Sequence, residues 1–268
     1  MPSLSNDLLG GLKLGCQAWS FNNKTALEAI ELTAKSGGSW IEFFPGQKLM
    51  EGSEERIGPD LSEGGVKRLQ AHCEKFSLKP IAFGVTGFGT NTNENRKTFE
   101  FAKKLGLYAI VTEPAPETLD SLEALVKEYD IRIAIHNHPR QPNNPNYKVW
   151  DPGYVLSLVT NRDSRLGSCA DIGHWVRSGV DPVKALKQLK GRVHGCHFKE
   201  LSKLSPDAGD VPSGTGNALA LGVLEELRRQ KHQGAVSIEY ETDYGSNTAA
   251  IGQCIGFVRG WAQSKRYV

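Results

Sequence analysis

The sequence lacks several features that mark whole classes of protein. It has no run of about 18 apolar residues, so no membrane-spanning helix is expected. Its Lys and Arg residues form no basic block and the formal net charge is only +2, so nothing in the charge favours nucleic acid as a ligand. The first 15 residues contain no charged segment followed by an apolar one, the pattern of a secretion signal.

Cysteine is scarce and follows no metal-binding or redox pattern. The chain has five cysteines, an odd number, and none belongs to a CxxC pair. Several lie inside apolar, strand-like runs, which favours buried, reduced thiols in a reducing compartment. We therefore expect a cytoplasmic protein, although an export signal removed ahead of residue 1 would leave no trace here.

Strand-like and helix-like segments alternate from end to end with no break in composition. The chain of 268 residues is close to the roughly 250 of a single (β/α)8 barrel. Eight strand–helix pairs are counted, and polar residues gather at the strand ends, which favours a barrel over an open doubly wound sheet. The sequence predicts one domain over residues 1–268, a TIM barrel, with strands at 13–19, 40–44, 78–85, 108–113, 131–138, 166–171, 193–198 and 235–241.

Five of these strands end in a carboxylate or an imidazole. The C-terminal ends of barrel strands meet around one pocket, so residues more than a hundred positions apart can converge there. A mixed set of oxygen and nitrogen donors suits a divalent metal such as Mn, Zn, Co, Fe or Mg. The candidate metal ligands are Glu113, His136, Asp171, His197 and Glu239.

Each candidate ligand also has a simpler interpretation. Asp171 alone could cap a helix, and His197 alone could be a hydrogen-bonded core histidine. One metal site explains these residues together better than separate coincidences at equivalent strand ends. The fourth ligand stays open: His136 would give two histidines and two carboxylates, whereas Glu113 would give one histidine and three carboxylates, a set that favours Mn or Mg.

Side chains alternate faces along a strand, so each strand end can present two groups to the pocket. His138 then shares a face with His136, Lys199 with His197, and Glu241 with Glu239. The candidate acid/base groups are His138, His174, Lys199 and Glu241. A nearby dication would lower the pKa of Lys199, whereas the simpler interpretation is a surface salt bridge with Glu200.

Residues from the same strand ends are candidates for binding substrate. Gln17 and Glu42 could bind hydroxyl groups, and Trp19 and Trp175 could provide apolar walls for the C–H face of a sugar. Aromatic residues at a barrel rim can also serve only for packing.

The motifs GCQAWSF, IEFFPGQ, HNHP, DIGHW, HFKE, PSGTGN and SIEYE cover nearly the whole chain. Together they resemble the xylose isomerase-like superfamily of sugar phosphate isomerases and epimerases, inosose dehydratases and endonuclease IV. The resemblance implies one divalent metal, with ligand roles for Asp171, His197 and Glu239. Many relatives have a glutamate where His136 stands, which makes Glu113 a credible substitute.

We therefore expect a metal-dependent sugar isomerase or epimerase that acts on a keto-sugar or related polyol carbonyl through an enediolate-type intermediate. One alternative is a metal-dependent lyase or dehydratase acting on a keto-sugar, keto-glycoside or inosose. A second is a sugar-binding barrel without catalysis. The expected partner is a small carbohydrate, not nucleic acid or a membrane, and a homo-oligomer stays open.

Overall fold

Eight parallel strands close into a barrel in the order of the sequence, which confirms the predicted TIM barrel. The computed structural model describes residues 9 and 11–265. Each strand pairs with the next, and the last pairs with the first, where Lys13 lies opposite Ala235. The strands are β1 (Lys13–Gln17), β2 (Trp40–Phe43), β3 (Lys79–Thr86), β4 (Ala109–Thr112), β5 (Arg132–Ile135), β6 (Leu166–Asp171), β7 (Val193–Phe198) and β8 (Ala235–Ile238).

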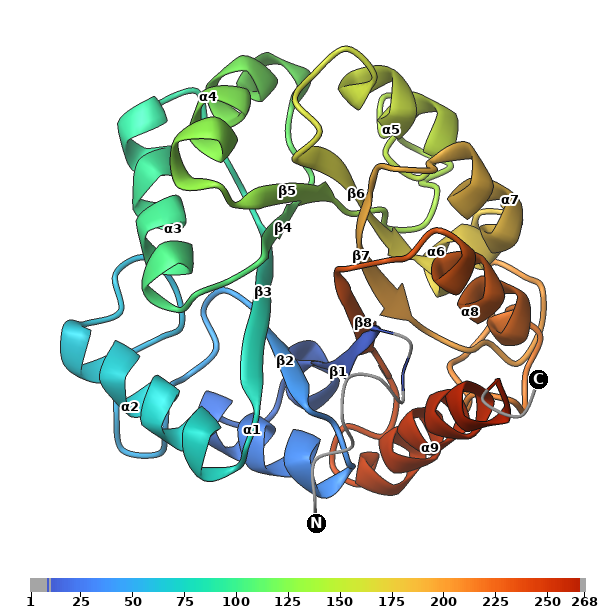
Figure 1. Ribbon diagram of the computed structural model, residues 1–268, viewed down its shortest axis with the longest axis horizontal. Helices are drawn as coiled ribbons and strands as arrows, with labels where there is room; N and C mark the ends of the chain where they lie inside the picture. Colours follow the sequence, from blue (N-terminus) through green and yellow to red (C-terminus); the bar gives the residue numbers. More distant parts are fainter. Residues whose placement is uncertain (1–8, 10, 266–268) are drawn as a thin grey trace.

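Helices form a ring around the barrel (Figure 1). They are α1 (Ala26–Lys35), α2 (Glu63–Lys75), α3 (Thr92–Lys104), α4 (Leu119–Tyr129), α5 (Pro152–Val159), α6 (Ile172–Arg177), α7 (Pro182–Gln188), α8 (Ala220–Arg229) and α9 (Thr248–Ser264). The sequence predicted one helix between β6 and β7, but the structure has two, because α6 begins directly after β6. Among the described residues, no helix is long and apolar enough to cross a membrane.

Small side chains fill the middle of the barrel. One buried apolar cluster lies there, in which small residues predominate; its members are Ile81, Ala82, Ala109, Val111, Ala134, Cys169 and Ala235. Gly15 on β1 allows an even closer approach, since a Cβ atom at this position would lie 1.8 Å from the carbonyl oxygen of Trp40. The five cysteines are buried free thiols, as the sequence led us to expect. The narrow middle layer separates the two mouths of the barrel.

Two buried histidines lie toward the N-terminal ends of the strands, away from the predicted site. The His194 ring contacts the carbonyl oxygen of Ser164 at 2.9 Å, and the His232 ring contacts that of Ala235 at 3.2 Å. Burial, with nearby cationic side chains, lowers the pKa of His194 to about 4, and burial likewise lowers the pKa of His232 to about 4. Both imidazoles are therefore neutral in the folded protein near pH 6.

These two histidines should make the protein sensitive to mild acid. These two imidazoles take up protons below about pH 6.5 in the unfolded chain, but only near pH 4 in the folded chain. Their contribution to the free energy of unfolding is therefore fully present above about pH 7 and decreases as the pH falls toward 4. The loss approaches about 3 kcal/mol per histidine at pH 4. Urea unfolding between pH 7.5 and 4.5 measures it. A His232→Gln variant should show a shallower pH dependence; an unchanged slope would contradict the assignment.

Candidate functional site

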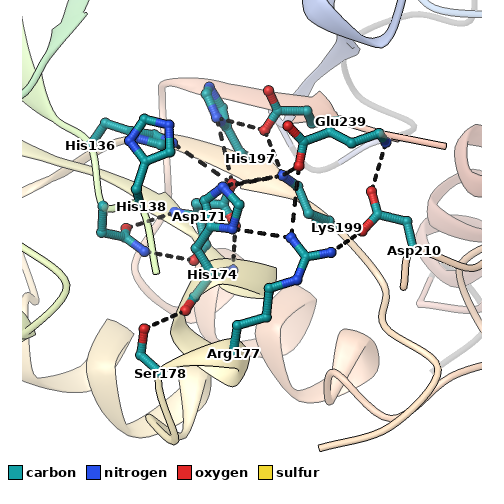
Figure 2. A network of polar contacts seen from close by, with 12 residues as sticks. His136, His138, Asp171, His174, Arg177, Ser178, His197, Lys199, Asp210 and Glu239 are labelled. Atoms are coloured by element: carbon teal, nitrogen blue, oxygen red, sulfur yellow. Dashed lines mark hydrogen bonds and ion pairs between the residues drawn. The ribbon is translucent and has the colours of Figure 1, made fainter. Parts of the chain in front are cut away.

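Four buried side chains converge at the C-terminal mouth of the barrel. His136 follows β5, Asp171 ends β6, His197 lies in β7 and Glu239 follows β8. One potential ligand atom from each lies within 4.8 Å of the others. Figure 2 shows these side chains turned toward one another around Asp171. The structure thus has a buried cluster of histidine, aspartate and glutamate that could bind a metal.

Three atoms of this cluster are buried and make no regular hydrogen bond: His136 Nε2, Asp171 Oδ2 and His197 Nδ1. Two of them have ion-pair neighbours, because Asp171 Oδ2 lies 3.3 Å from Lys199 Nζ and His197 Nδ1 lies 3.1 Å from Glu239 Oε2. Asp171 Oδ2 lies 3.7 Å from His136 Nε2 and 3.9 Å from His197 Nδ1. Ligands about 2.1 Å from one ion are separated by at most about 4.2 Å, so these spacings suit a shared cation. Burying polar atoms without a regular hydrogen bond is costly, and one divalent ion would coordinate all three. The residues therefore fit the expected metal.

The two oxygens of the Asp171 carboxylate have different contacts. Oδ1 accepts a 2.7 Å hydrogen bond from the backbone N–H of His174 and so caps α6. The Asn137 amide holds the backbone on both sides, accepting from Asp171 N at 3.0 Å and donating to its carbonyl oxygen at 2.9 Å. This leaves Oδ2 aimed at the cluster. The helix cap and the metal-ligand role are therefore compatible.

Glu42, a predicted hydroxyl binder, contacts the His197 ring in this structure. Its Oε1 lies 2.9 Å from His197 Nε2, and its Oε2 accepts a 2.8 Å hydrogen bond from Ser237. Gln17 donates to the same carboxylate at 3.1 Å. Glu42 is 1% exposed, because these partners enclose it inside the barrel. With Nε2 directed at this carboxylate, Nδ1 of His197 faces the other candidate ligands, 3.1 Å from Glu239 Oε2 and 3.9 Å from Asp171 Oδ2.

Glu113 contacts the side of the His136 ring that faces away from Asp171, and it lies outside the four-residue cluster. Its Oε1 is 3.0 Å from His136 Nδ1, the nitrogen on the opposite side of the ring from the one that faces Asp171. A carboxylate in this position orients a metal-binding imidazole and raises its basicity. The geometry therefore favours His136 as the fourth ligand and Glu113 as its support.

The same carboxylate holds a second histidine. Glu113 Oε1 accepts from the backbone N–H of His138 at 3.1 Å and lies 2.5 Å from its Nδ1. Tyr147 donates its hydroxyl to Glu113 at 3.0 Å. Burial alone would raise the pKa of Glu113, but His136 and His138 outweigh burial and hold it well below its ordinary value. Tyr147 lies in the long loop after β5, and no motif in the sequence pointed to it.

Lys199 is buried among carboxylates. Its Nζ lies 3.3 Å from Asp171, 3.1 Å from Glu239 and 2.5 Å from Glu241. Burial opposes the charged form, yet these carboxylates outweigh it and hold the pKa of Lys199 well above its usual value. The surface salt bridge with Glu200 is wrong: Glu200 instead accepts a 2.6 Å hydrogen bond from the backbone N–H of Ala218.

His174 extends the network toward α6. Its Nε2 lies 3.6 Å from Asp171 Oδ2 and 3.5 Å from Lys199 Nζ, while its Nδ1 lies 3.2 Å from the Arg177 guanidinium. Burial lowers the pKa of His174 well below its usual value, opposed by Asp171 and reinforced by Lys199. Arg177 in turn pairs with Asp210 at 2.5 Å (Figure 2). Sequence analysis missed both partners, because Arg177 lies on the unpredicted helix and Asp210 in a loop.

A cavity of about 230 Å³ opens beside the cluster. Trp19 is 40% exposed there and meets Phe44 edge to face, with ring centroids 4.9 Å apart, so the two rings form an apolar wall. Trp175 does not line the cavity: it is 1% exposed, because it lies about 100° around α6 from His174 and packs into the core. The lining residues are Gln17, Trp19, Phe44, Pro45, Gly84, Val85, His136, His138, His174, Glu239 and Glu241.

Comparison with known proteins adds independent information on the family. A sequence profile described as xylose isomerase-like TIM barrel matches residues 30–261. No curated protein matches the chain in sequence.

Solved structures resemble the whole barrel. An uncharacterized protein from Parabacteroides distasonis is 35% identical, with a TM-score of 0.74, covering 93% of this chain and 99% of that one. A D-tagatose 3-epimerase-like protein is 19% identical, with a TM-score of 0.71 and coverage of 96% and 100%. The IolI protein with a bound zinc atom is 18% identical, with a TM-score of 0.71 and coverage of 95% and 99%. At such identities the last two show the shared fold.

Proposed function

Because the chain belongs to the xylose isomerase-like TIM barrel family, we propose that it is a divalent-metal-dependent enzyme that isomerises or epimerises a keto-sugar or related polyol carbonyl. One observation carries this proposal: buried side-chain atoms of His136, Asp171, His197 and Glu239 that could bind a metal lie within 4.8 Å of one another beside the cavity, and three of these residues have a buried atom with no regular hydrogen bond. A divalent ion bound there supplies a Lewis acid for the carbonyl and neighbouring hydroxyl oxygens of the substrate.

His138 is the proposed general base. Its Nδ1 is held by Glu113 at 2.5 Å, which leaves Nε2 to take up a proton. The His138 side chain is 48% exposed and lines the cavity, so a substrate can reach it. An imidazole oriented by a carboxylate in this way can abstract the proton next to a carbonyl and form an enediolate-type intermediate.

Glu241 and Lys199 form the proposed second acid/base pair. Glu241 lines the cavity and lies 2.5 Å from the Lys199 ammonium. In Figure 2 the histidines 136 and 138 lie on one side of Asp171 and the Lys199 ammonium on the other. Epimerisation requires a proton to leave one face of the carbon and another to arrive at the opposite face. Acid/base groups on two sides of Asp171 suit that requirement.

The cavity wall supports a carbohydrate as substrate. Polar groups from His138, His174 and Glu241 occupy part of the lining, and the rings of Trp19 and Phe44 occupy another part. A monosaccharide presents hydroxyl groups along its edges and C–H groups on its ring face. The mixed lining matches both kinds of surface.

A solvent-exchange experiment tests the proposed proton transfer. With a panel of ketohexoses in heavy water, deuterium should enter the carbon next to the carbonyl in product or recovered substrate, because the proton leaves to a base. Nuclear magnetic resonance measures the incorporation, with His138→Asn expected to suppress it. A shielded base can return the same proton, so the fate of a deuterium label on the substrate is followed as well, to distinguish proton transfer from a hydride shift. Quantitative transfer of a substrate deuterium label between carbons would instead establish a hydride shift and refute the enediolate.

A lyase or dehydratase is the second candidate, favoured by the contact between Lys199 and Glu241 at the cavity wall. A carboxyl group beside an ammonium can deliver a proton to a departing hydroxyl or glycosidic oxygen. The enediolate-type intermediate proposed above would then lose water or an aglycone. Mass spectrometry of the reaction distinguishes the two candidates, because isomerisation leaves the mass unchanged and elimination lowers it.

A further inference from the structure

The N-terminal mouth of the barrel carries a cluster of cations that the proposed chemistry does not use. Lys13, Lys79 and Arg132 lie at the first residues of β1, β3 and β5. Lys13 is on the same face of β1 as Gln17, and Arg132 on the same face of β5 as Ala134, which packs in the barrel interior. The three cations therefore gather at the end of the barrel opposite the candidate metal site.

Two aromatic rings alternate with these cations. Lys13 Nζ lies 4.6 Å from the centre of the Tyr108 ring and 5.6 Å from that of Trp40. The Arg132 guanidinium lies 4.2 Å from Tyr108, and Lys79 Nζ lies 5.6 Å from Trp40. Trp40 and Tyr108 pack against the buried cluster of the barrel interior at the N-terminal ends of the strands. We call these five residues the basal cluster.

No carboxylate balances the basal cluster within residues 9 and 11–265. The side chains of Lys13, Lys79 and Arg132 form no ion pair and no side-chain hydrogen bond with a described residue, and each charged group lies over a ring face. Burial and the neighbouring Arg132 lower the pKa of Lys13, which fits an environment of one sign. Arg132 also contributes to the lowered pKa of His194, and Lys13 to that of His232.

The basal cluster is open to solvent. Lys79 is exposed and the other four members are partly exposed, so solvent reaches each residue of the cluster. A guanidinium carries five N–H donors in a planar fork that matches two oxygens of a phosphate, and two ammonium groups beside it add charge without geometric demand. Three cations at one mouth of the barrel, with no counter-ion among residues 9 and 11–265, favour a small, multiply charged anion.

We propose that this mouth of the barrel is an anion-binding site, and that it takes a small phosphate-bearing anion between Lys13, Lys79 and Arg132. The site lies beyond the narrow middle layer of the barrel and is separate from the candidate metal centre. Its occupant neutralises the basal cluster and thereby stabilises the closed barrel.

Inorganic phosphate is the probe, measured by calorimetric titration of the intact, metal-loaded protein and compared with sodium chloride at equal ionic strength. Phosphate should bind with a Kd of about 1 mM or tighter at low salt and should weaken as salt rises. The double variant Lys13→Gln/Arg132→Gln should weaken binding at least about tenfold. The matched control is Lys103→Gln, because Lys103 also lies over a ring, that of Tyr129 at 5.7 Å, but outside the cluster.

Histidine signals locate the bound anion without relying on a variant. Phosphate should shift the imidazole resonances of His194 and His232, while those of His136 and His197 at the other mouth stay in place. If the double variant fails to fold, Lys79→Gln replaces it, since this exposed side chain is not needed for packing, and about a threefold weakening is expected. Unchanged affinity in the folded variant, or shifts confined to His136 and His197, would overturn the proposal.

Discussion

Replacing Asp171 by asparagine should abolish metal binding and lower turnover by roughly a thousandfold or more. Asparagine retains an oxygen that can accept from His174 N, so the cap of α6 survives, whereas the negative charge that faces His136 and His197 is lost. The fold should therefore remain intact. Metal analysis after incubation with Mn, Zn, Co and Fe should find about one ion per wild-type chain and far less in the variant.

Asp181→Asn is the matched control for this experiment. Asp181 caps α7 through Oδ1, which accepts from the backbone N–H groups of Val183 at 2.9 Å and Lys184 at 3.0 Å. It resembles Asp171 in its local role and is absent from the metal cluster. The control should keep its metal and its activity. Full metal content and wild-type turnover in Asp171→Asn would show that the cluster is not the active centre.

Gly15→Ala should destabilise the protein by about 4 kcal/mol or more, or prevent folding altogether. The added Cβ would lie 1.8 Å from the carbonyl oxygen of Trp40 and 2.4 Å from its carbonyl carbon. These are backbone atoms of the neighbouring strand, so no side chain can turn aside and β1 must move away from β2. Thermal or urea unfolding measures the effect.

Gly260→Ala is the comparison. Gly260 lies within α9, and a Cβ there would meet nothing within 4 Å. Alanine should stabilise this helix by about 0.5–1 kcal/mol, because it costs less conformational entropy than glycine. Similar, small effects at Gly15 and Gly260 would contradict the close strand approach.

The sequence predicted the barrel because each strand is a short apolar run that ends in polar residues. It also predicted which strand ends converge, since this follows from the geometry of parallel strands alone. The structure brings His136, Asp171, His197 and Glu239 within reach of one ion, and alternation along the strands correctly placed His138 and Glu241 at the same cavity. Their chemical roles remain proposals.

Contacts between side chains of different strands were beyond the sequence. The carboxylate of Glu42 is of a kind that binds hydroxyl groups, but its position opposite His197 is set by the radius and register of the barrel. Trp175 was placed at the rim because the start of α6 was not recognised. Tyr147 reaches Glu113 from a long loop whose path has no periodic pattern to reveal it.

The pairing of β1 with β8 has a consequence for how this chain reaches its fold. Lys13 and Ala235 are partners, so the seam of the barrel joins segments from nearly opposite ends of the described chain. During synthesis, the free edge of β1 must wait until β8 has emerged from the ribosome, and contacts of such long sequence separation form slowly. In that interval two unpaired strand edges are open to other chains. Protection of these edges, more than the stability of the finished barrel, should determine how much of the protein is recovered when it is expressed.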